Sequence, residues 1–242
     1  MPGQVIIQKR NNFFSLVLSL LALMAVAALS ALIPDGEAEI FLTSVFLLTL
    51  AVAYASLNFG NIWRSMVLFL LAALLVDFLF KQFILIEGQK SNLYTAVILL
   101  LFFLGESHQA GKSILQSLSK RQVDRNMLTA TLALYLLIGL IYAMLYLILL
   151  EFNPAGLQGF ENAQGGDRFV TAIYFSFVTM TSLGYGDISP TGPIGQIMVI
   201  IEAITGTFYM AVIVATMVAT LIGNQISEDE NAFLEQEEKT NE

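Results

Sequence analysis

Long apolar stretches alternate with short polar segments along the chain. They lie near 13–33, 39–57, 62–80, 92–104, 127–150 and 193–223. A helix needs about 20 residues to cross a hydrocarbon core of roughly 30 Å, and most of these stretches are close to that length. None has the alternating pattern of a barrel strand, and backbone groups in lipid must bond internally. The pattern therefore predicts an all-α membrane protein with six transmembrane helices, of which the fourth is the shortest.

The amino-acid composition agrees with this fold class and argues against several classes of function. The chain is 57% hydrophobic and 12% charged, whereas a soluble domain carries about 25% charge. Without cysteine, and with His108 as its single histidine, the sequence offers no disulfide, zinc cluster or thiol nucleophile. We find no nucleophile–base pair or phosphate loop. We therefore expect neither an enzyme nor a cofactor, and the net charge of −8 gives no support for nucleic-acid binding.

Basic residues indicate the orientation of the chain in the membrane. With both termini inside, only Lys81, Lys90 and Arg168 face outward, and the other eight basic residues face the cytoplasm. This distribution satisfies the positive-inside rule. The first stretch also resembles a secretory signal peptide, but it is longer than the usual apolar core of about 7–15 residues. We expect a multi-pass protein of the plasma or bacterial inner membrane with cytoplasmic termini.

A short amphipathic segment precedes the sixth span. Residues 167–180 are too few to cross the membrane but suit a re-entrant helix, with Asp167 as its N-cap. Its C-terminus would point into the membrane, where the helix dipole favours a cation. In the following segment, Gly184 and Gly186 can take left-handed backbone angles, so that successive carbonyls could face one axis. Tyr185 between them could pack outward and brace the segment.

Residues 179–187 read Thr-Met-Thr-Ser-Leu-Gly-Tyr-Gly-Asp and closely resemble the potassium-channel signature Thr-x-Thr-Thr-Val-Gly-Tyr-Gly-Asp. The resemblance implies a homotetramer, since the chain contains one Gly-Tyr-Gly and four copies must surround the pore. It also implies potassium coordination by the backbone carbonyls of Thr181 or Ser182, Leu183, Gly184 and Tyr185, with the Ser182 hydroxyl innermost and with support from Thr179, Gly186, Asp187 and Tyr174.

Three positions depart from the family pattern. Ser182 replaces a threonine and Leu183 replaces a valine, changes that we expect to alter ion occupancy while preserving selectivity. Tyr174 stands where many relatives have a tryptophan that bonds the filter aspartate. Its hydroxyl could still reach Asp187.

The sixth span contains two residues with alternative interpretations. Gly206 matches the family's hinge glycine but could instead allow close helix packing. Glu202 is a carboxylate in a membrane helix and is functional by default. It could be protonated or hydrogen-bonded behind the filter and act as a proton sensor, or it could attract ions into the cavity. By helical spacing from the hinge, the residues expected to line the cavity and gate are Thr207, Met210, Val214, Val218 and Ile222.

The predicted domains are a four-helix voltage-sensor-like domain at 1–105, a linker at 106–126, a pore domain at 127–223 and an acidic, solvated, disordered tail at 224–242. The linker is either an amphipathic helix at the inner membrane surface or a plain basic connector. The fourth span carries no arginine. Each gating charge contributes about 2.3 kcal/mol per 100 mV, so we expect no steep voltage dependence.

The sequence predicts a potassium-selective channel subunit whose partners are potassium ions, lipid and other copies of itself. A non-selective cation channel and a non-conducting assembly subunit are the alternatives, while a carrier would need four filter repeats in one chain. Few residues follow Ile222, fewer than the regulatory domains of many prokaryotic channels require. The trigger stays open among protons at Glu202, lipid at the linker and membrane tension.

Overall fold

The computed structural model describes residues 13–30, 44–49, 51–52, 65, 68–76, 89–119, 124–160 and 166–241. Almost all of these residues are helical. The named elements are α1 (Phe13–Ser30), α4 (Gln89–Ser119), α5 (Arg125–Phe152), β1 (Leu157–Gln158), α6 (Gly166–Met180), β2 (Ser189–Pro190), α7 (Pro193–Phe208), the π-helix η1 (Tyr209–Val214) and α8 (Ala215–Asn241).

Within the described residues, three helical stretches are long and apolar enough to cross a membrane. They are Leu93–Ser119, Arg125–Phe152 and Pro193–Ser227. The second and third predicted spans lie partly outside the described residues. The chain is thus a helical membrane protein, and its six-span topology stays a prediction.

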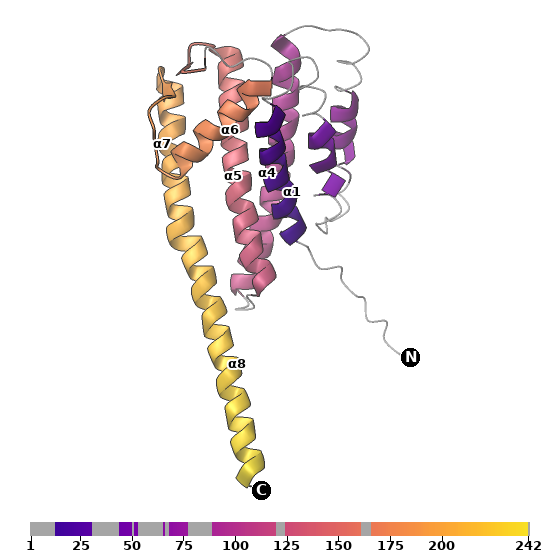
Figure 1. Ribbon diagram of the computed structural model, residues 1–242, viewed down its shortest axis with the longest axis vertical. Coiled ribbons are helices and arrows are strands. Elements are labelled where there is room, and N and C mark those ends of the chain that lie inside the picture. The colour runs from indigo at the N-terminus through magenta and orange to yellow at the C-terminus, as the bar shows by residue number, and fades with distance from the viewer. Residues whose placement is uncertain are drawn as a thin grey trace.

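The helix α5 lies at the centre of the structure. Figure 1 shows α1 and α4 on one side of it and α6 and α7 on the other, and α5 contacts all four helices. Its start is fixed by Asp124, whose carboxylate accepts a hydrogen bond of 2.9 Å from the Met127 N–H. Such an N-cap satisfies a donor that the helix itself cannot. Leu137, Leu140 and Met144 are fully buried, so this helix forms the middle of the apolar core.

The helix α4 continues past the predicted end of the fourth span. It has 31 residues and ends at Ser119, so the proposed boundary at 105–106 is not a helix boundary. Phe102, Glu106, Ala110 and Ile114 are all buried, and their spacing of four continues one helical face. This face packs along α5, and the segment 106–119 is part of α4 instead of a separate surface helix.

The helix α6 crosses obliquely between α5 and α7 (Figure 1). The described part of the helix begins at Gly166. The predicted N-cap role of Asp167 concerns a side chain outside the described ones and stays a prediction. The 15 residues of α6 are too few to span a bilayer. Near its N-terminus, Arg168 forms an ion pair of 3.0 Å with Glu151 at the end of α5. The N-terminal end of α6 is therefore held by α5.

The elements α7, η1 and α8 form one long rod, and its C-terminal end extends beyond the other helices (Figure 1). The sequence predicted a disordered tail after residue 223, but α8 continues to Asn241. No glycine or proline follows Gly223, and the tail is rich in glutamate, glutamine and other good helix formers. These preferences explain why the helix continues in spite of the acidic charge.

Gly206 lies where α7 contacts the C-terminus of α6. A Cβ atom placed on Gly206 would overlap the Met180 carbonyl oxygen and lie 2.5 Å from the Met180 Cγ. The structure therefore shows the packing role that the sequence left open. The first irregular turn of the rod is η1, which begins three residues after Gly206. The hinge role stays a prediction.

We expect Gly206→Ala to destabilise the protein by about 1–3 kcal/mol, because the new methyl group meets backbone atoms that cannot move aside easily. Gly223→Ala is a matched control in the same rod, since a Cβ at Gly223 meets open space. It should be neutral or stabilising by up to about 1 kcal/mol. Thermal unfolding in detergent measures both, and equal unfolding temperatures would contradict the close packing at Gly206.

Candidate ion-conducting site

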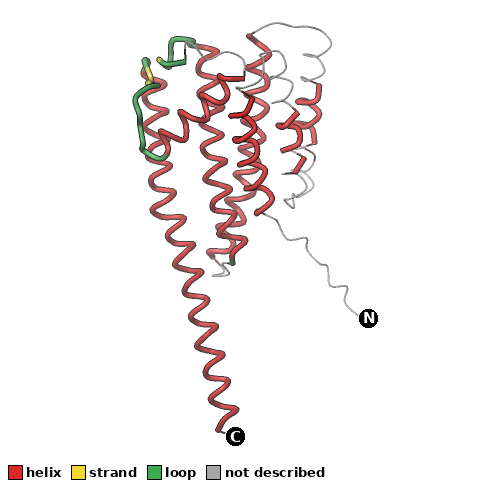
Figure 2. The backbone as a smooth tube through the Cα atoms, viewed as in Figure 1, coloured by secondary structure: helices red, strands yellow, loops and turns green. Residues whose placement is uncertain are grey.

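The loop after α6 runs back along α7 toward its start (Figure 2). Its N–H groups bond to the last carbonyls of α6. The Leu183 and Gly184 N–H groups donate to the Val178 oxygen at 2.9 and 3.2 Å, and the Ser182 N–H donates to the Thr179 oxygen at 2.9 Å. These carbonyls have no partner within an α-helix. The loop therefore begins as a hydrogen-bonded continuation of the helix end.

The backbone of the loop alternates in handedness. Ser182, Gly184 and Gly186 have φ angles of 59°, 54° and 81°, whereas Thr181, Leu183 and Tyr185 do not have positive φ. Left-handed angles cost little at glycine but about 1–2 kcal/mol at another residue. The sequence predicted this conformation at the two glycines and missed it at Ser182. Alternation of this kind turns successive peptide groups the same way, so their carbonyls can face one side.

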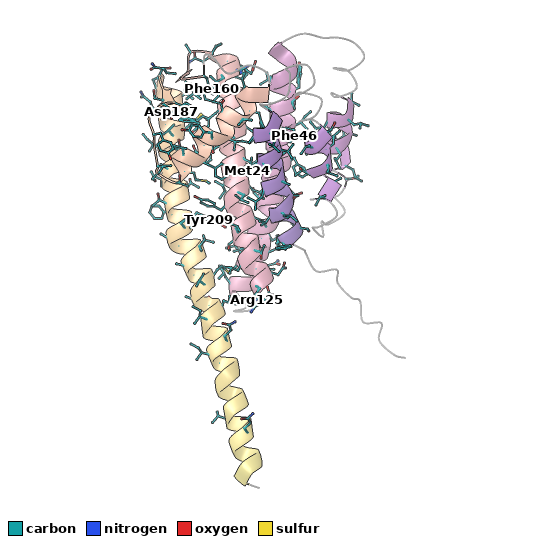
Figure 3. The ribbon with its side chains drawn as sticks, viewed as in Figure 1. Met24, Phe46, Arg125, Phe160, Asp187 and Tyr209 are labelled. Carbon is teal, nitrogen blue, oxygen red and sulfur yellow. The ribbon has the colours of Figure 1, made fainter. Side chains whose placement is uncertain are left out.

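Tyr174 braces the outer end of the loop. Its hydroxyl donates to the Asp187 carboxylate at 2.7 Å, so the bond expected from the sequence is present. Its ring also stacks on Tyr185, with centroids 6.4 Å apart and planes at 9°. The sequence did not predict this stacking. Figure 3 places Asp187 near the beginning of α7, at the outer end of the loop.

A small two-stranded sheet anchors the chain just after the loop. β1 pairs antiparallel with β2, with Leu157 opposite Pro190 and Gln158 opposite Ser189. Gly159 follows with a φ of 97°, and a Cβ there would overlap the Asp187 carbonyl oxygen. The sequence analysis missed this contact. One leucine and one glutamine beside a glycine are too weak a signal to predict a two-residue strand.

The predicted gate residues do not form one α-helical row. Thr207 lies 3.4 Å from Ser182, hydroxyl to hydroxyl, and so reaches the inner end of the loop. Below it, the wider turn of η1 changes the register that the prediction assumed. Met210 and Val214 line an apolar pocket of about 320 Å³ against α5. Val218 and Ile222 are exposed farther along α8.

A hydrogen bond holds η1 against α5. The Tyr209 hydroxyl donates to the Thr131 carbonyl oxygen at 2.6 Å, and Figure 3 shows Tyr209 where the rod faces α5. A π-helix inside an α-helix is often found at a functional site. Here it separates α7, which lies beside the loop, from α8, which extends beyond the other helices.

Glu202 lies in a buried polar cluster behind the loop, formed with Tyr146 and Ser176. Its side chain is fully buried. The Tyr146 hydroxyl is 2.5 Å from Glu202 Oε2, and the Ser176 Oγ is 2.5 Å from Glu202 Oε1 and 2.7 Å from the Gly139 carbonyl oxygen. The carboxyl group is therefore hydrogen-bonded behind the loop, as one of the two interpretations expected, and does not face a cavity.

The sequence analysis identified Glu202 but none of its partners. A buried carboxyl group requires polar partners, and this was the available signal. It did not identify them because Tyr146 and Ser176 lie 56 and 26 residues away in the sequence. The Phe177 ring packs directly against Gly139, where a Cβ atom would lie 2.6 Å from Phe177 Cζ. The absence of a side chain at Gly139 therefore makes room for this ring.

Comparison with known proteins assigns this part of the chain. Residues 130–222 match the family described as "Ion channel". The chain therefore carries an ion channel domain. This domain extends from α5 into α8 and includes the loop and the Glu202 cluster. The match indicates a channel and not an enzyme, as the sequence predicted.

Curated relatives are similar over part of their length. The chain is 35% identical over 85 residues to the inward rectifier potassium channel Kirbac3.1 of Paramagnetospirillum magnetotacticum, covering 35% of this chain and 26% of that protein. It is 33% identical over 105 residues to two-pore potassium channel 4 of Arabidopsis thaliana, covering 42% and 36%. It is 37% identical over 87 residues to protein LctB of Bacillus caldotenax, covering 35% and 64%. No solved structure gives a significant match.

We expect Ser176→Ala to lower the free energy of unfolding by about 1–3 kcal/mol, because it leaves a buried carboxyl oxygen without its partner. Ser227→Ala removes a hydroxyl that is exposed and bonds only within its own helix, and should change stability by less than about 0.5 kcal/mol. Thermal unfolding of the two variants in the same detergent tests this. Similar unfolding temperatures would show that the Ser176 hydroxyl does not stabilise the cluster.

Proposed function

We propose that the chain is one subunit of a homotetrameric, potassium-selective channel of the cell membrane. The observation that carries the proposal is the alternation of left-handed φ angles at Ser182, Gly184 and Gly186. In this conformation the carbonyls of residues 181–185 can face the pore axis and replace the hydration shell of a potassium ion. A row of N–H groups bonded to α6 leaves these oxygens available for ions.

The pore helix α6 adds to the attraction for a cation. Its C-terminus lies directly before the loop, and a helix C-terminus carries roughly half a negative charge. Two of the relatives named above are called potassium channels. Their names and the Thr-Met-Thr-Ser-Leu-Gly-Tyr-Gly-Asp segment support the same ion. We propose potassium as the ion on these grounds.

Several surfaces of the single chain suit assembly into a tetramer. Leu183 and Tyr185 are 56% and 67% exposed, and Cβ atoms on Gly184 and Gly186 would meet open space. A filter needs carbonyls from several chains around one axis, and this chain supplies one strand of it. Exposed apolar residues along α7, among them Ile197, Ile200 and Ile204, suit contact with other subunits and lipid.

The proposed channel is not steeply voltage-gated. The helix α4 contains no arginine between Gln89 and Ser119. Steep voltage dependence needs several charges that move through the field, each worth about 2.3 kcal/mol per 100 mV. We propose that the gate lies in the part of the rod that follows α7, in η1 and the first turns of α8. We also propose that both termini lie in the cytoplasm.

Reconstitution of the full chain into liposomes tests the function. We expect potassium flux that barium blocks, little sodium flux and weak dependence on voltage. Equal sodium and potassium flux would favour a non-selective cation channel, and no flux of either ion would favour an assembly subunit. Steep activation by voltage would contradict the interpretation of α4.

We expect Tyr174→Phe to accelerate the decay of potassium current during sustained opening by several fold. The variant keeps the ring that stacks on Tyr185 but loses the hydrogen bond that restrains Asp187. Tyr94→Phe is the control, because Tyr94 is an exposed side chain on α4. Current recordings in planar lipid bilayers at constant voltage measure the decay. Identical decay in Tyr174→Phe and in the unsubstituted channel would disprove the bracing role.

A further inference from the structure

The cluster around Glu202 joins the three helices of the ion channel domain at one buried point. Glu202 comes from α7, Ser176 from α6 and Tyr146 from α5, and the Gly139 carbonyl on α5 completes it. Its three contacts are short, at 2.5, 2.5 and 2.7 Å between oxygen atoms. At such distances each pair of oxygens must share a proton, since oxygens without one would repel.

Counting protons identifies the charge state of the carboxyl group. The Tyr146 and Ser176 hydroxyls carry one proton each, and the Gly139 carbonyl oxygen can only accept. Three contacts need three protons, so the two hydroxyls leave one contact without a donor. If Tyr146 donates to Glu202 and Ser176 donates to Gly139, the remaining proton lies between Glu202 Oε1 and Ser176 Oγ. It must belong to the carboxyl group.

The surroundings favour the same charge state. In the part of the chain that the structure describes, Tyr135 interacts electrostatically with Glu202 and Tyr142 with Tyr146. Both tyrosines lie on α5 and are neutral when protonated. Among the described residues, no lysine, arginine or histidine forms an ion pair with Glu202. An ionised carboxylate at a fully buried position without a cation is costly. A neutral carboxylic acid avoids this cost and satisfies every contact.

We propose that Glu202 is a neutral carboxylic acid that donates its proton to Ser176, and that removing this proton at alkaline pH stops ion conduction. Conduction itself rests on the proposed function. After deprotonation, Ser176 can donate either to Glu202 or to Gly139, so one link between the pore helix and its neighbours is lost. The N–H groups of the filter bond to carbonyls two and three residues after Ser176, and movement of α6 displaces the filter directly.

The first test observes the proton without measuring conduction. Infrared spectra of the purified protein in lipid at neutral pH should contain a carboxylic-acid carbonyl band that shifts in deuterium oxide and disappears at alkaline pH. Glu202→Gln should remove the part of this band that Glu202 contributes, because the amide fills the same space and keeps a donor and an acceptor but has no carboxylic-acid carbonyl. Glu106→Gln is the matched control, since Glu106 is another buried carboxyl group, in α4.

A carboxylic-acid band that is the same in Glu202→Gln as in the unsubstituted protein would overturn the proposal, as would the absence of any protonated carboxyl band at neutral pH. Ser176→Ala removes the acceptor of the carboxyl proton and should shift the band to higher wavenumber. This shift tests the proposal even if Glu202→Gln fails to fold.

The second test measures potassium flux in liposomes against pH. For a one-proton equilibrium, flux above the titration point should fall about tenfold for each pH unit. Glu202→Gln, which is neutral at every pH, should lose this dependence, and Glu106→Gln should keep it. A flat profile in the unsubstituted protein, or equal profiles with and without Glu202, would overturn the regulation. No potassium flux in any sample would reject the proposed function instead, and the infrared bands would still decide the charge state.

Discussion

The close contact of α6 with both α5 and α7 is the constraint on which the rest of the ion channel domain depends. Side chains are excluded at two points of this contact: the Phe177 ring fills the space beside Gly139, and the Met180 backbone lies against Gly206. Between them, the Glu202 cluster links all three helices through buried hydrogen bonds. Packed interiors have little free volume, so α6 has few alternative positions.

The position of the loop after α6 follows from the position of α6. The first half of the loop is bonded through its N–H groups to the last carbonyls of the helix. These hydrogen bonds restrain its backbone angles relative to the end of α6. The second half is restrained by Tyr174 through Asp187 and Tyr185, and by the β1–β2 pair beyond it. A non-glycine residue, Ser182, adopts a left-handed angle there. Strained conformations persist only where the surrounding structure enforces them.

The first part of the chain contacts the same helices from the other side. α1 packs against α5 and α6, and α4 packs along α5 over a long distance. Phe46 meets Phe169 of α6 edge to face, with ring centroids 4.8 Å apart. The family match covers residues 130–222, and the similarity to the curated relatives covers only part of the length of each relative. The contacts with α1 and Phe46 thus connect a part of the chain outside that match to α6.

Several features of this protein could be predicted from the sequence because they depend on residues close together in the chain. Apolar length predicted the membrane helices around residues 127–150 and 193–223, since a bilayer imposes its thickness on any helix that crosses it. Glycine spacing predicted the left-handed positions 184 and 186, and a short segment between two apolar stretches predicted the short helix α6. The reach of a tyrosine hydroxyl was enough to predict the bond between Tyr174 and Asp187.

Tertiary structure decided the features that depend on residues far apart in the chain. Examples are the contacts of Glu202 with Tyr146 and Ser176, the contact of Gly139 with Phe177, and the pairing of β1 with β2. Each joins positions that are far apart in the sequence, so no local pattern relates them. The π-helix at Tyr209–Val214 is stabilised by a bond from Tyr209 to Thr131, 78 residues away, so α-helical spacing alone could not predict the register beyond it. Periodicity describes one element, whereas these contacts arise only when several elements pack together.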